Sequence, residues 1–195
     1  MSFNQRIQEH FNESLQTNMM IADSLHQDIT LIAEQLIQTI LKGHKILIGS
    51  NASASSHANY FANLLIHGFN IERPSLPAIS LSCNVAMRSS IAFDEQFTSI
   101  FTRQIQALGQ AQDIFLLFSI DGEEKYLIDA IEAAKEKNMR IISITGKDGG
   151  KIHQMLHDND AGMCIPSANK ARILESQLSI IHCLSDLIDR GIFGA

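Results

Sequence analysis

Apolar residues recur every three or four positions over residues 3–42, in two separate runs. The first run consists of Ile7, Phe11, Leu15 and Met19, and the second of Leu25, Ile29, Ile32, Leu36 and Ile40. This spacing places the apolar side chains on one face of a helix, so it predicts two amphipathic helices. Gly43 follows the second run, and glycine commonly ends a helix because it accepts a positive φ.

Beyond Gly43 the pattern changes to short apolar runs at 45–49, 78–81, 114–118, 141–145 and 163–165. Each run is unbroken rather than alternating, as in strands that are covered on both faces of a parallel sheet. Helical spacing lies between the runs, at 57–69, 97–108, 123–137 and 152–157, and again at the end, over 170–189. This order predicts an α/β fold with right-handed crossovers: a three-layer sandwich in which helices flank a parallel sheet. We expect one domain overall, in which residues 1–42 form a helical N-terminal arm and residues 43–195 the α/β unit.

Composition excludes several classes of protein. Apolar residues make up 45 % of the 195 positions and charged residues 18 %, which is not the composition of a disordered or collagen-like chain. No apolar run approaches the ~18–20 residues of a membrane helix, and the first residues lack the apolar stretch of a signal peptide. We therefore expect a soluble, cytoplasmic protein. The net charge of −6 and the lack of a dense Lys/Arg cluster argue against direct binding of nucleic acid.

The three cysteines are Cys83, Cys164 and Cys183, an odd number with no CxxC spacing. Two lie in apolar sequence, so we expect reduced, buried thiols.

Three loops are candidates for a binding site, because ligands of an open parallel sheet bind beyond the carboxyl ends of its strands. These loops cover residues 50–56 (SNASASS), 119–124 (SIDGEE) and 145–150 (TGKDGG). The serines of the first loop precede a helix, where their backbone N–H groups suit an anion and their hydroxyls suit capping; capping is favoured. The glycines of the third loop suit a phosphate nest, although turns use Gly for conformation alone, and the turn is favoured.

These loops, placed after two N-terminal helices, resemble the sugar isomerase (SIS) domain family. The resemblance is to the branch that holds the phosphoheptose isomerases and the DnaA initiator-associating proteins. It is carried by residues 73–79 (RPSLPAI), 107–113 (ALGQAQD), 145–151 (TGKDGGK), 171–173 (ARI) and 183–193 (CLSDLIDRGIF). The first and last of these segments are more similar to the initiator-associating proteins. The resemblance implies a five-stranded parallel sheet and a homotetramer, with the arm packed in the oligomer and sites between subunits.

The resemblance also shows where the chain departs from an isomerase. The family isomerises sedoheptulose 7-phosphate with a Glu after the first loop and a His on the last helix. The Glu position is Leu64 here, whereas the His position is retained as His182. Some members hold zinc at four positions that are Tyr60, Leu64, Leu174 and His182 in this chain, and one His does not make a zinc site. We therefore expect no metal and no cofactor, and we assign no catalytic residue: His182 is only the one catalytic position of the family that is retained.

The phosphate loop departs as well. The family motif STSGNS is replaced by residues 119–124, which bring Asp121, Glu123 and Glu124 close to the place of a dianion. Alternatively, the three acids simply begin a helix, where negative charge is favourable; both interpretations disfavour a phosphate. In the first loop the family's phosphate-binding Ser falls on Ala54, and Ser53, Ser55 and Ser56 are the available substitutes.

The remaining positions that match family sites form a substrate-binding remnant, namely Asn51, Ser53, Asp94, Ser119 and His182. The candidates to replace the missing base are His57, Tyr60 and Asp94. His182 also has a structural interpretation, an ion pair with Asp186 one helical turn further on.

Two functions of different classes follow from the resemblance. The first is a non-catalytic tetrameric scaffold that binds DnaA and promotes replication initiation. Its partner-binding pair matches Ile192 and Phe193, for which packing in the tetramer is the alternative role. The second is a sedoheptulose 7-phosphate isomerase of heptose precursor synthesis, and between them stands a sensor that binds a sugar phosphate weakly without turnover. The loss of the base, which removes about 10²–10⁴ in rate, favours the scaffold.

Overall fold

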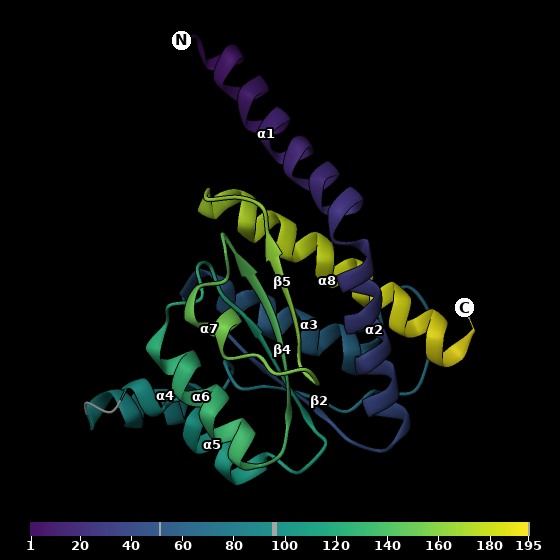
Figure 1. The fold of residues 1–195 in the computed structure, drawn as a ribbon, viewed down its shortest axis with the longest axis vertical. Helices are drawn as coiled ribbons and strands as arrows, with labels where there is room; N and C mark the ends of the chain where they lie inside the picture. The colour runs from purple at the N-terminus through teal and green to yellow at the C-terminus, as the bar shows by residue number, and fades with distance from the viewer. Residues whose placement is uncertain (51, 95–96, 195) are drawn as a thin grey trace.

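The computed structural model describes residues 1–50, 52–94 and 97–194, without the side chains of residues 88 and 92. Five strands form one parallel sheet in the order β2-β1-β3-β4-β5, and Figure 1 shows this sheet between its helices, with β2, β4 and β5 labelled. Their bounds are Ile46–Gly49 (β1), Ala78–Ser80 (β2), Ile114–Phe118 (β3), Arg140–Gly146 (β4) and Ala161–Ile165 (β5). Each strand falls on one of the unbroken apolar runs, so the predicted α/β sandwich with a five-stranded parallel sheet is confirmed.

Helices cover both faces of this sheet. On one face lie α2 (His26–Leu41), α3 (Ser55–His67) and α8 (Lys170–Phe193), and on the other α4 (Val85–Phe93), α5 (Thr102–Leu108), α6 (Lys125–Glu136) and α7 (Gly150–Gln154). Alternate strand residues feed two separate cores: Ile46 and Ile48 pack toward α2, α3 and α8, whereas Leu47 packs toward α4–α7. Both faces of the sheet are therefore covered by apolar side chains, which explains why each strand is a continuous apolar run in the sequence. No helix among the described residues is both long and apolar enough to cross a membrane.

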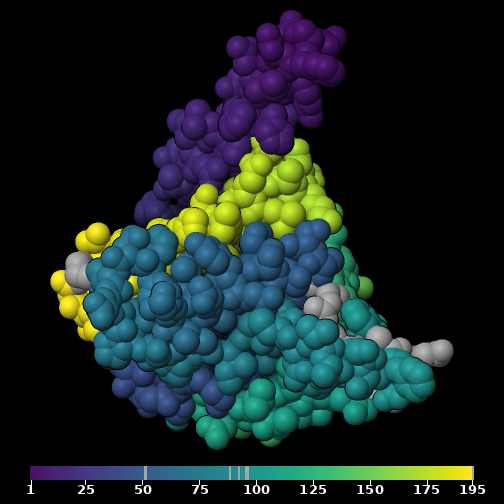
Figure 2. Space-filling view, turned by 180° about the vertical axis from the view of Figure 1, so that it is seen from behind, coloured from purple at the N-terminus to yellow at the C-terminus, as the bar shows by residue number. Residues whose placement is uncertain are grey.

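The N-terminal segment forms the two predicted helices. α1 (Phe3–Ser24) is followed after Leu25 by α2, and Gly43 ends the helical path with φ +79°. The apolar face of α2 belongs to the main core through Ile32 and Leu36, both fully buried. In contrast, α1 projects beyond the body, and Figure 2 shows its outer turns clear of α8. The two halves of the segment thus differ, since α2 covers the sheet whereas the outermost turns of α1 project from the described part of the chain.

The sequence pattern missed α4 and merged two elements after it. Of the apolar residues in α4, Val85 and Phe93 are 74 % and 89 % exposed, so the helix has no continuous buried stripe to reveal it. The helix predicted over 97–108 is a 3₁₀ turn at Phe97–Ser99 followed by α5. α6 begins at Lys125 rather than at residue 123, and α8 continues four residues further than predicted, to Phe193.

The cysteines are free thiols, but the prediction that they are buried is wrong. Cys83 and Cys183 are exposed and Cys164 is partly exposed. Cys83 follows the edge strand β2, and Cys183 lies on a face of α8 that no element of this chain fully covers, so apolar neighbours in sequence did not lead to burial.

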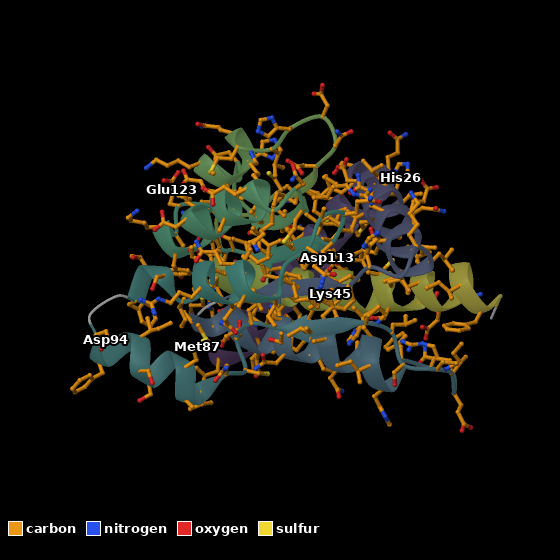
Figure 3. All side chains as sticks on the ribbon, turned by 90° about the horizontal axis from the view of Figure 1, so that it is seen from below. His26, Lys45, Met87, Asp94, Asp113 and Glu123 are labelled. Carbon is orange, nitrogen blue, oxygen red and sulfur yellow. The ribbon has the colours of Figure 1, made fainter. Side chains whose placement is uncertain are left out.

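Asp113 joins the starts of β1 and β3. Its fully buried carboxylate accepts hydrogen bonds from the Lys45 ammonium (2.6 Å), the Lys45 backbone N–H (3.0 Å) and the Gln110 backbone N–H (2.9 Å). Figure 3 labels Asp113 and Lys45 next to each other near the centre of the view. A buried carboxylate is tolerated only when it is paired and hydrogen-bonded in this way.

We predict that Asp113→Ala lowers the free energy of unfolding by about 3 kcal/mol, because it leaves a half-buried ammonium and two backbone donors without their acceptor. Urea unfolding followed by circular dichroism measures the loss. The matched control is Asp129→Ala, which removes the exposed pair with Lys125 (2.9 Å) and should leave the midpoint nearly unchanged. Equal losses in the two variants would contradict the assignment.

Candidate functional site

The three predicted loops lie together, because β1, β3 and β4 are neighbours in the sheet and each loop follows the carboxyl end of one of them. The first loop leads through a short 3₁₀ turn (Ala52–Ala54) into α3, the second into α6 and the third into α7. This is the end of the sheet where a ligand was expected.

The serines of the first loop do not cap α3. Ser55 and Ser56 donate their hydroxyl hydrogens backward, to the carbonyl oxygens of Ala52 (2.8 Å) and Ser53 (3.1 Å), and the N-cap residue is Ala54 without a side-chain bond. The capping prediction is therefore wrong, because the turn before α3 offers carbonyl acceptors to these hydroxyls first. Ser53 is exposed. Asn51, another predicted remnant, lies outside the described residues.

In the second loop, a carboxylate of the loop accepts a hydrogen bond from a hydroxyl of the same loop. The buried Ser119 hydroxyl donates to the Glu124 carboxylate (2.5 Å) and accepts from the backbone N–H of Gly122 (2.7 Å). Glu124 stands at the N-cap of α6 but makes no side-chain capping bond, and no acid lies in the first turn. The acids thus do not act as simple helix starters: Glu124 turns back to Ser119.

The other two acids bind the third loop. Asp121 pairs with Lys147 (3.2 Å), and Glu123 pairs with the Lys151 ammonium (3.4 Å) while also accepting from the Lys151 backbone N–H (3.1 Å). The following N–H, that of Ile152, donates to the Gly122 carbonyl (3.0 Å). The backbone N–H groups of Lys151 and Ile152, in the first turn of α7, are therefore already occupied by acceptors of the second loop.

Glycine is required where these loops meet. Gly122 has φ +74°, and a Cβ placed there would lie 1.9 Å from the carbonyl oxygen of Gly149. Gly149 itself, at the N-cap of α7, has φ +79°. The Gly150 N–H donates to the Asp148 carboxylate (3.2 Å). The conformational interpretation of the third-loop glycines is confirmed, because each supports a turn or a close backbone approach.

A pocket of about 380 Å³ lies beside the first loop, lined by Ser56, His57, Tyr60, Leu178 and His182. The pocket brings His182 together with His57 and Tyr60, two of the three candidates to replace the missing base. Gln177 fixes the orientation of His57 from the buried side of the pocket. The Gln177 Nε2 donates to the carbonyl oxygens of Ser119 (2.8 Å) and Ile144 (3.2 Å). The Gln177 Oε1 therefore faces His57 Nδ1, at 3.2 Å. His57 Nδ1 must then carry the hydrogen, which leaves Nε2 as the basic nitrogen. Burial lowers the pKa of His57 below its ordinary value, and the Gln177 bond opposes part of that shift.

His182 is held by aromatic neighbours. Its Nε2 lies 3.1 Å from the Tyr60 hydroxyl, and its ring stacks on Phe69 at 5.5 Å between centroids. The predicted ion pair with Asp186 is wrong, because Asp186 pairs instead with Arg190 at 2.7 Å, one turn further along α8.

The positions that hold zinc in some relatives do not fit a metal here. Leu64 is only 7 % exposed and belongs to the main core, and Leu174 packs against the same core. Tyr60 and His182 therefore stand without further ligands from these positions. Within the described part of the chain, no three His, Cys, Asp or Glu side chains gather in a way that could hold a metal ion.

Asp94 does not join the pocket. It is exposed, follows the last turn of α4 and lies at the periphery of the molecule in Figure 3. The remnant residues of a single chain therefore divide into Ser119 in the second loop, His182 in the pocket, and Ser53 and Asp94 at the surface.

The predicted partner-binding pair has two unlike members. Ile192 is partly buried against the main core, whereas Phe193 is 38 % exposed and lies over the Arg73 guanidinium (5.7 Å from Cζ to the ring centroid). Arg73 in turn bonds Asp189 at 2.7 Å, with both side chains buried. Sequence reasoning gave neither Asp189 nor Arg73 a role of its own. The only signal was a lone Arg before Pro74 in the RPSLPAI segment.

Comparisons with known proteins agree on one family. A model of the SIS domain family matches residues 9–146. The chain is 42 % identical over 189 residues to the phosphoheptose isomerases of Shewanella piezotolerans and Shewanella pealeana, covering 97 % of this chain and 96 % of theirs. The structure is similar to the phosphoheptose isomerase of Francisella tularensis, with TM-score 0.91, 31 % identity, and coverage of 97 % of this chain and 100 % of that one.

The phosphoheptose isomerase of Neisseria gonorrhoeae is equally similar, with TM-score 0.91, 31 % identity and coverage of 96 % and 99 %. HobA in a complex with DnaA domains I–II from Helicobacter pylori shares the fold at TM-score 0.57 and 14 % identity, over 100 % of this chain and 97 % of that one. The chain therefore belongs to the SIS domain family, within the group of the phosphoheptose isomerases.

Proposed function

We propose that the protein is a non-catalytic homotetrameric scaffold that binds the replication initiator DnaA through its C-terminal residues Ile192 and Phe193. The observation that carries the proposal is the set of contacts made by the second loop. Glu124 accepts the hydrogen bond of the Ser119 hydroxyl, and Asp121 and Glu123 form ion pairs with the third loop and the start of α7. The loop that would have to hold a substrate phosphate is filled by carboxylates of the chain itself.

A phosphate dianion is disfavoured at this loop for two reasons. Three carboxylates stand within six residues, and their repulsion of an incoming dianion is reduced but not removed by water and salt. In addition, the donors are already paired, so that a ligand would have to displace a 2.5 Å hydrogen bond and two ion pairs. Loss of phosphate contacts removes binding energy that an isomerase uses in its transition state.

Proton transfer lacks its base as well. Isomerisation of a ketose phosphate requires one group to take a carbon-bound proton and another to return it, both positioned at the substrate. The position of the family's Glu holds Leu64, whose side chain is buried in the core. The retained His182 is engaged with Tyr60 and Phe69.

Isomerisation of sedoheptulose 7-phosphate remains the second candidate, and two observations favour it. Curated phosphoheptose isomerases are 42 % identical over nearly the whole chain. The pocket also contains His57 with an unprotonated Nε2 and a lowered pKa, an available base beside His182. A sensor that binds a sugar phosphate through Asn51, Ser53 and Ser119 without turnover is the intermediate case.

The tetramer is supported by the face of α1 that nothing covers in a single chain. Five of its apolar side chains are between 55 % and 90 % exposed at four-residue spacing, namely Phe3, Ile7, Phe11, Leu15 and Met19. Where α1 and α2 meet α8, an apolar hollow of about 390 Å³ is lined by residues that include Ile21, Ile29 and Leu187. Exposed apolar surface of this extent marks an interface, and copies of the same chain would cover it.

DnaA as the partner rests on the resemblance of the C-terminal segment and on a fold relative, HobA, whose structure contains DnaA domains I–II. A tetramer presents Phe193 four times and so binds several initiator molecules with avidity. The net charge of −6 suits a protein partner rather than direct contact with DNA. This role places the protein in the cytoplasm.

Restoring the family's loop should restore an anion site. We predict that the triple variant Asp121→Ser, Glu123→Asn, Glu124→Ser binds inorganic phosphate and sedoheptulose 7-phosphate at millimolar concentration, whereas the unmodified protein does not. A ligand that binds only the folded state raises the melting temperature, so a thermal shift measures the gain. Glu132→Gln, on the outer part of α6, is the control for lost charge. Binding by the unmodified protein would contradict the filled-loop interpretation.

Charge on the face of α1 should break the oligomer without unfolding the chain. We predict that Phe11→Asp with Leu15→Asp shifts the tetramer to smaller species in light scattering, with unchanged circular dichroism, because both side chains are exposed in the single chain. Asn12→Asp with Gln16→Glu adds the same charge on neighbouring faces of α1 and should leave the tetramer intact. A tetramer that survives in the first variant would exclude α1 from the interface.

The DnaA interaction should depend on Phe193. We predict that Phe193→Ala weakens binding to DnaA domains I–II by about 10–100-fold, the usual effect of removing an aromatic anchor from an interface. Calorimetry with the full tetramer measures the dissociation constant. Phe93→Ala removes an even more exposed ring on α4 and serves as the control. If the unmodified protein shows no binding, the proposed partner is wrong.

A further inference from the structure

The last turn of α8 is held more firmly than the end of a chain usually is. Terminal residues commonly fray unless other elements hold them. Here Gly191 lies so close to α2 that a Cβ at this position would come within 2.5 Å of Ile37 Cδ1. On another side, Asp189 accepts from Arg73 Nε at 2.7 Å, and only 2 % of the Arg73 side chain and 5 % of the Asp189 side chain are exposed. The turn that carries Phe193 is thus fixed to two neighbouring segments.

The Arg73 guanidinium is itself immobilised by four hydrogen bonds. Besides Asp189, it donates from Nη1 to the carbonyl oxygens of Leu65 (2.8 Å) and Pro74 (3.0 Å), and from Nη2 to that of Leu64 (2.9 Å). The Leu64 and Leu65 carbonyls belong to the last turns of α3, where the helix dipole favours a cation. A planar group with four of its five hydrogens placed has little freedom to rotate.

Phe193 lies on this immobilised plane. The guanidinium carbon is 5.7 Å from the ring centroid, within the range of a cation–π contact, and the ring stays 38 % exposed. One side of the ring therefore has a rigid support while the rest of the ring faces outward. Since Arg73 is buried, it cannot itself be a contact residue for a partner.

We infer that Arg73 is a positioning residue for the partner surface: paired with Asp189, it holds Phe193 in the orientation that an apolar pocket of a protein partner receives. This inference rests on the proposed function and extends it to residues 116 positions apart in sequence. A ring that is ordered before binding loses less conformational entropy on association, so its support raises affinity without touching the partner.

The variant that tests the inference removes both buried charges together. Arg73→Met alone would leave the Asp189 carboxylate unpaired in the interior and could unfold the protein, whereas Arg73→Met with Asp189→Leu replaces the pair by apolar side chains of similar volume. Arg190→Gln is the matched control, because it removes an exposed ion pair with Asp186 from the same turn of α8.

Hydrogen exchange of backbone amides provides a measurement that needs no partner. In the paired variant, the amides of Phe193 and Gly194 should exchange at least 10-fold faster relative to the amides of β3, which serve as an internal reference for global unfolding. The control should change the same ratio less than 2-fold. An unchanged ratio in the paired variant would overturn the inference, because Arg73 would then not order the turn.

Binding to DnaA domains I–II provides the second measurement, as a double-mutant cycle. The paired variant should bind about 5–10-fold more weakly, whereas adding the paired change to Phe193→Ala should weaken binding further by less than 2-fold, because without the ring its support has nothing to position. Fully additive losses, or no loss in the paired variant, would overturn the inference while leaving the proposed function intact. If the unmodified protein fails to bind but the exchange ratio rises as expected, the proposed partner is wrong and the ordering role of Arg73 stands.

Discussion

The hydrogen bond from the Ser119 hydroxyl to the Glu124 carboxylate governs the chemistry of the loop end of the sheet. A loop binds a phosphate with hydroxyls and N–H groups that have no other acceptor, and here the acceptor is built into the chain. Asp121 and Glu123 extend the same principle to the third loop, so that two loops which could surround a ligand bind each other instead. We propose that these satisfied charges, rather than a bulky side chain, keep a phosphate out of the loops.

These contacts within the chain, in place of contacts with a ligand, leave the fold unaltered. The structures of two phosphoheptose isomerases are similar to this one at TM-score 0.91 and 31 % identity, so the overall fold is shared. A fold of this kind does not determine an activity; the side chains at its loop end do. With Leu64 in the core and the loop donors occupied, what remains available is surface: the exposed face of α1 and the ring of Phe193.

The sequence predicted most of the fold because burial on both faces leaves a direct mark, an unbroken apolar run for each strand. α4 left no such mark, since Val85 and Phe93 point away from the core of this chain. Pairings between residues that are distant in sequence could not be predicted, because periodicity does not identify the partner of a side chain. Asp189 closes the helical stretch predicted over 170–189, and only the structure shows that it pairs with Arg73, 116 residues away. Capping was the favoured role of the first-loop serines, but nearer carbonyls accept their hydroxyl hydrogens. The start of a helix was one of two interpretations of the second-loop acids, and Glu124 accepts from the Ser119 hydroxyl instead.

The most direct test of the account is turnover of sedoheptulose 7-phosphate by the purified protein, followed by NMR at millimolar substrate over hours. We predict no aldose phosphate above the level of a blank, because the loop lacks a free phosphate site and position 64 lacks a base. Steady production of the aldose phosphate that is abolished by His57→Asn would contradict the account and assign the chemistry to the pocket of His57 and His182.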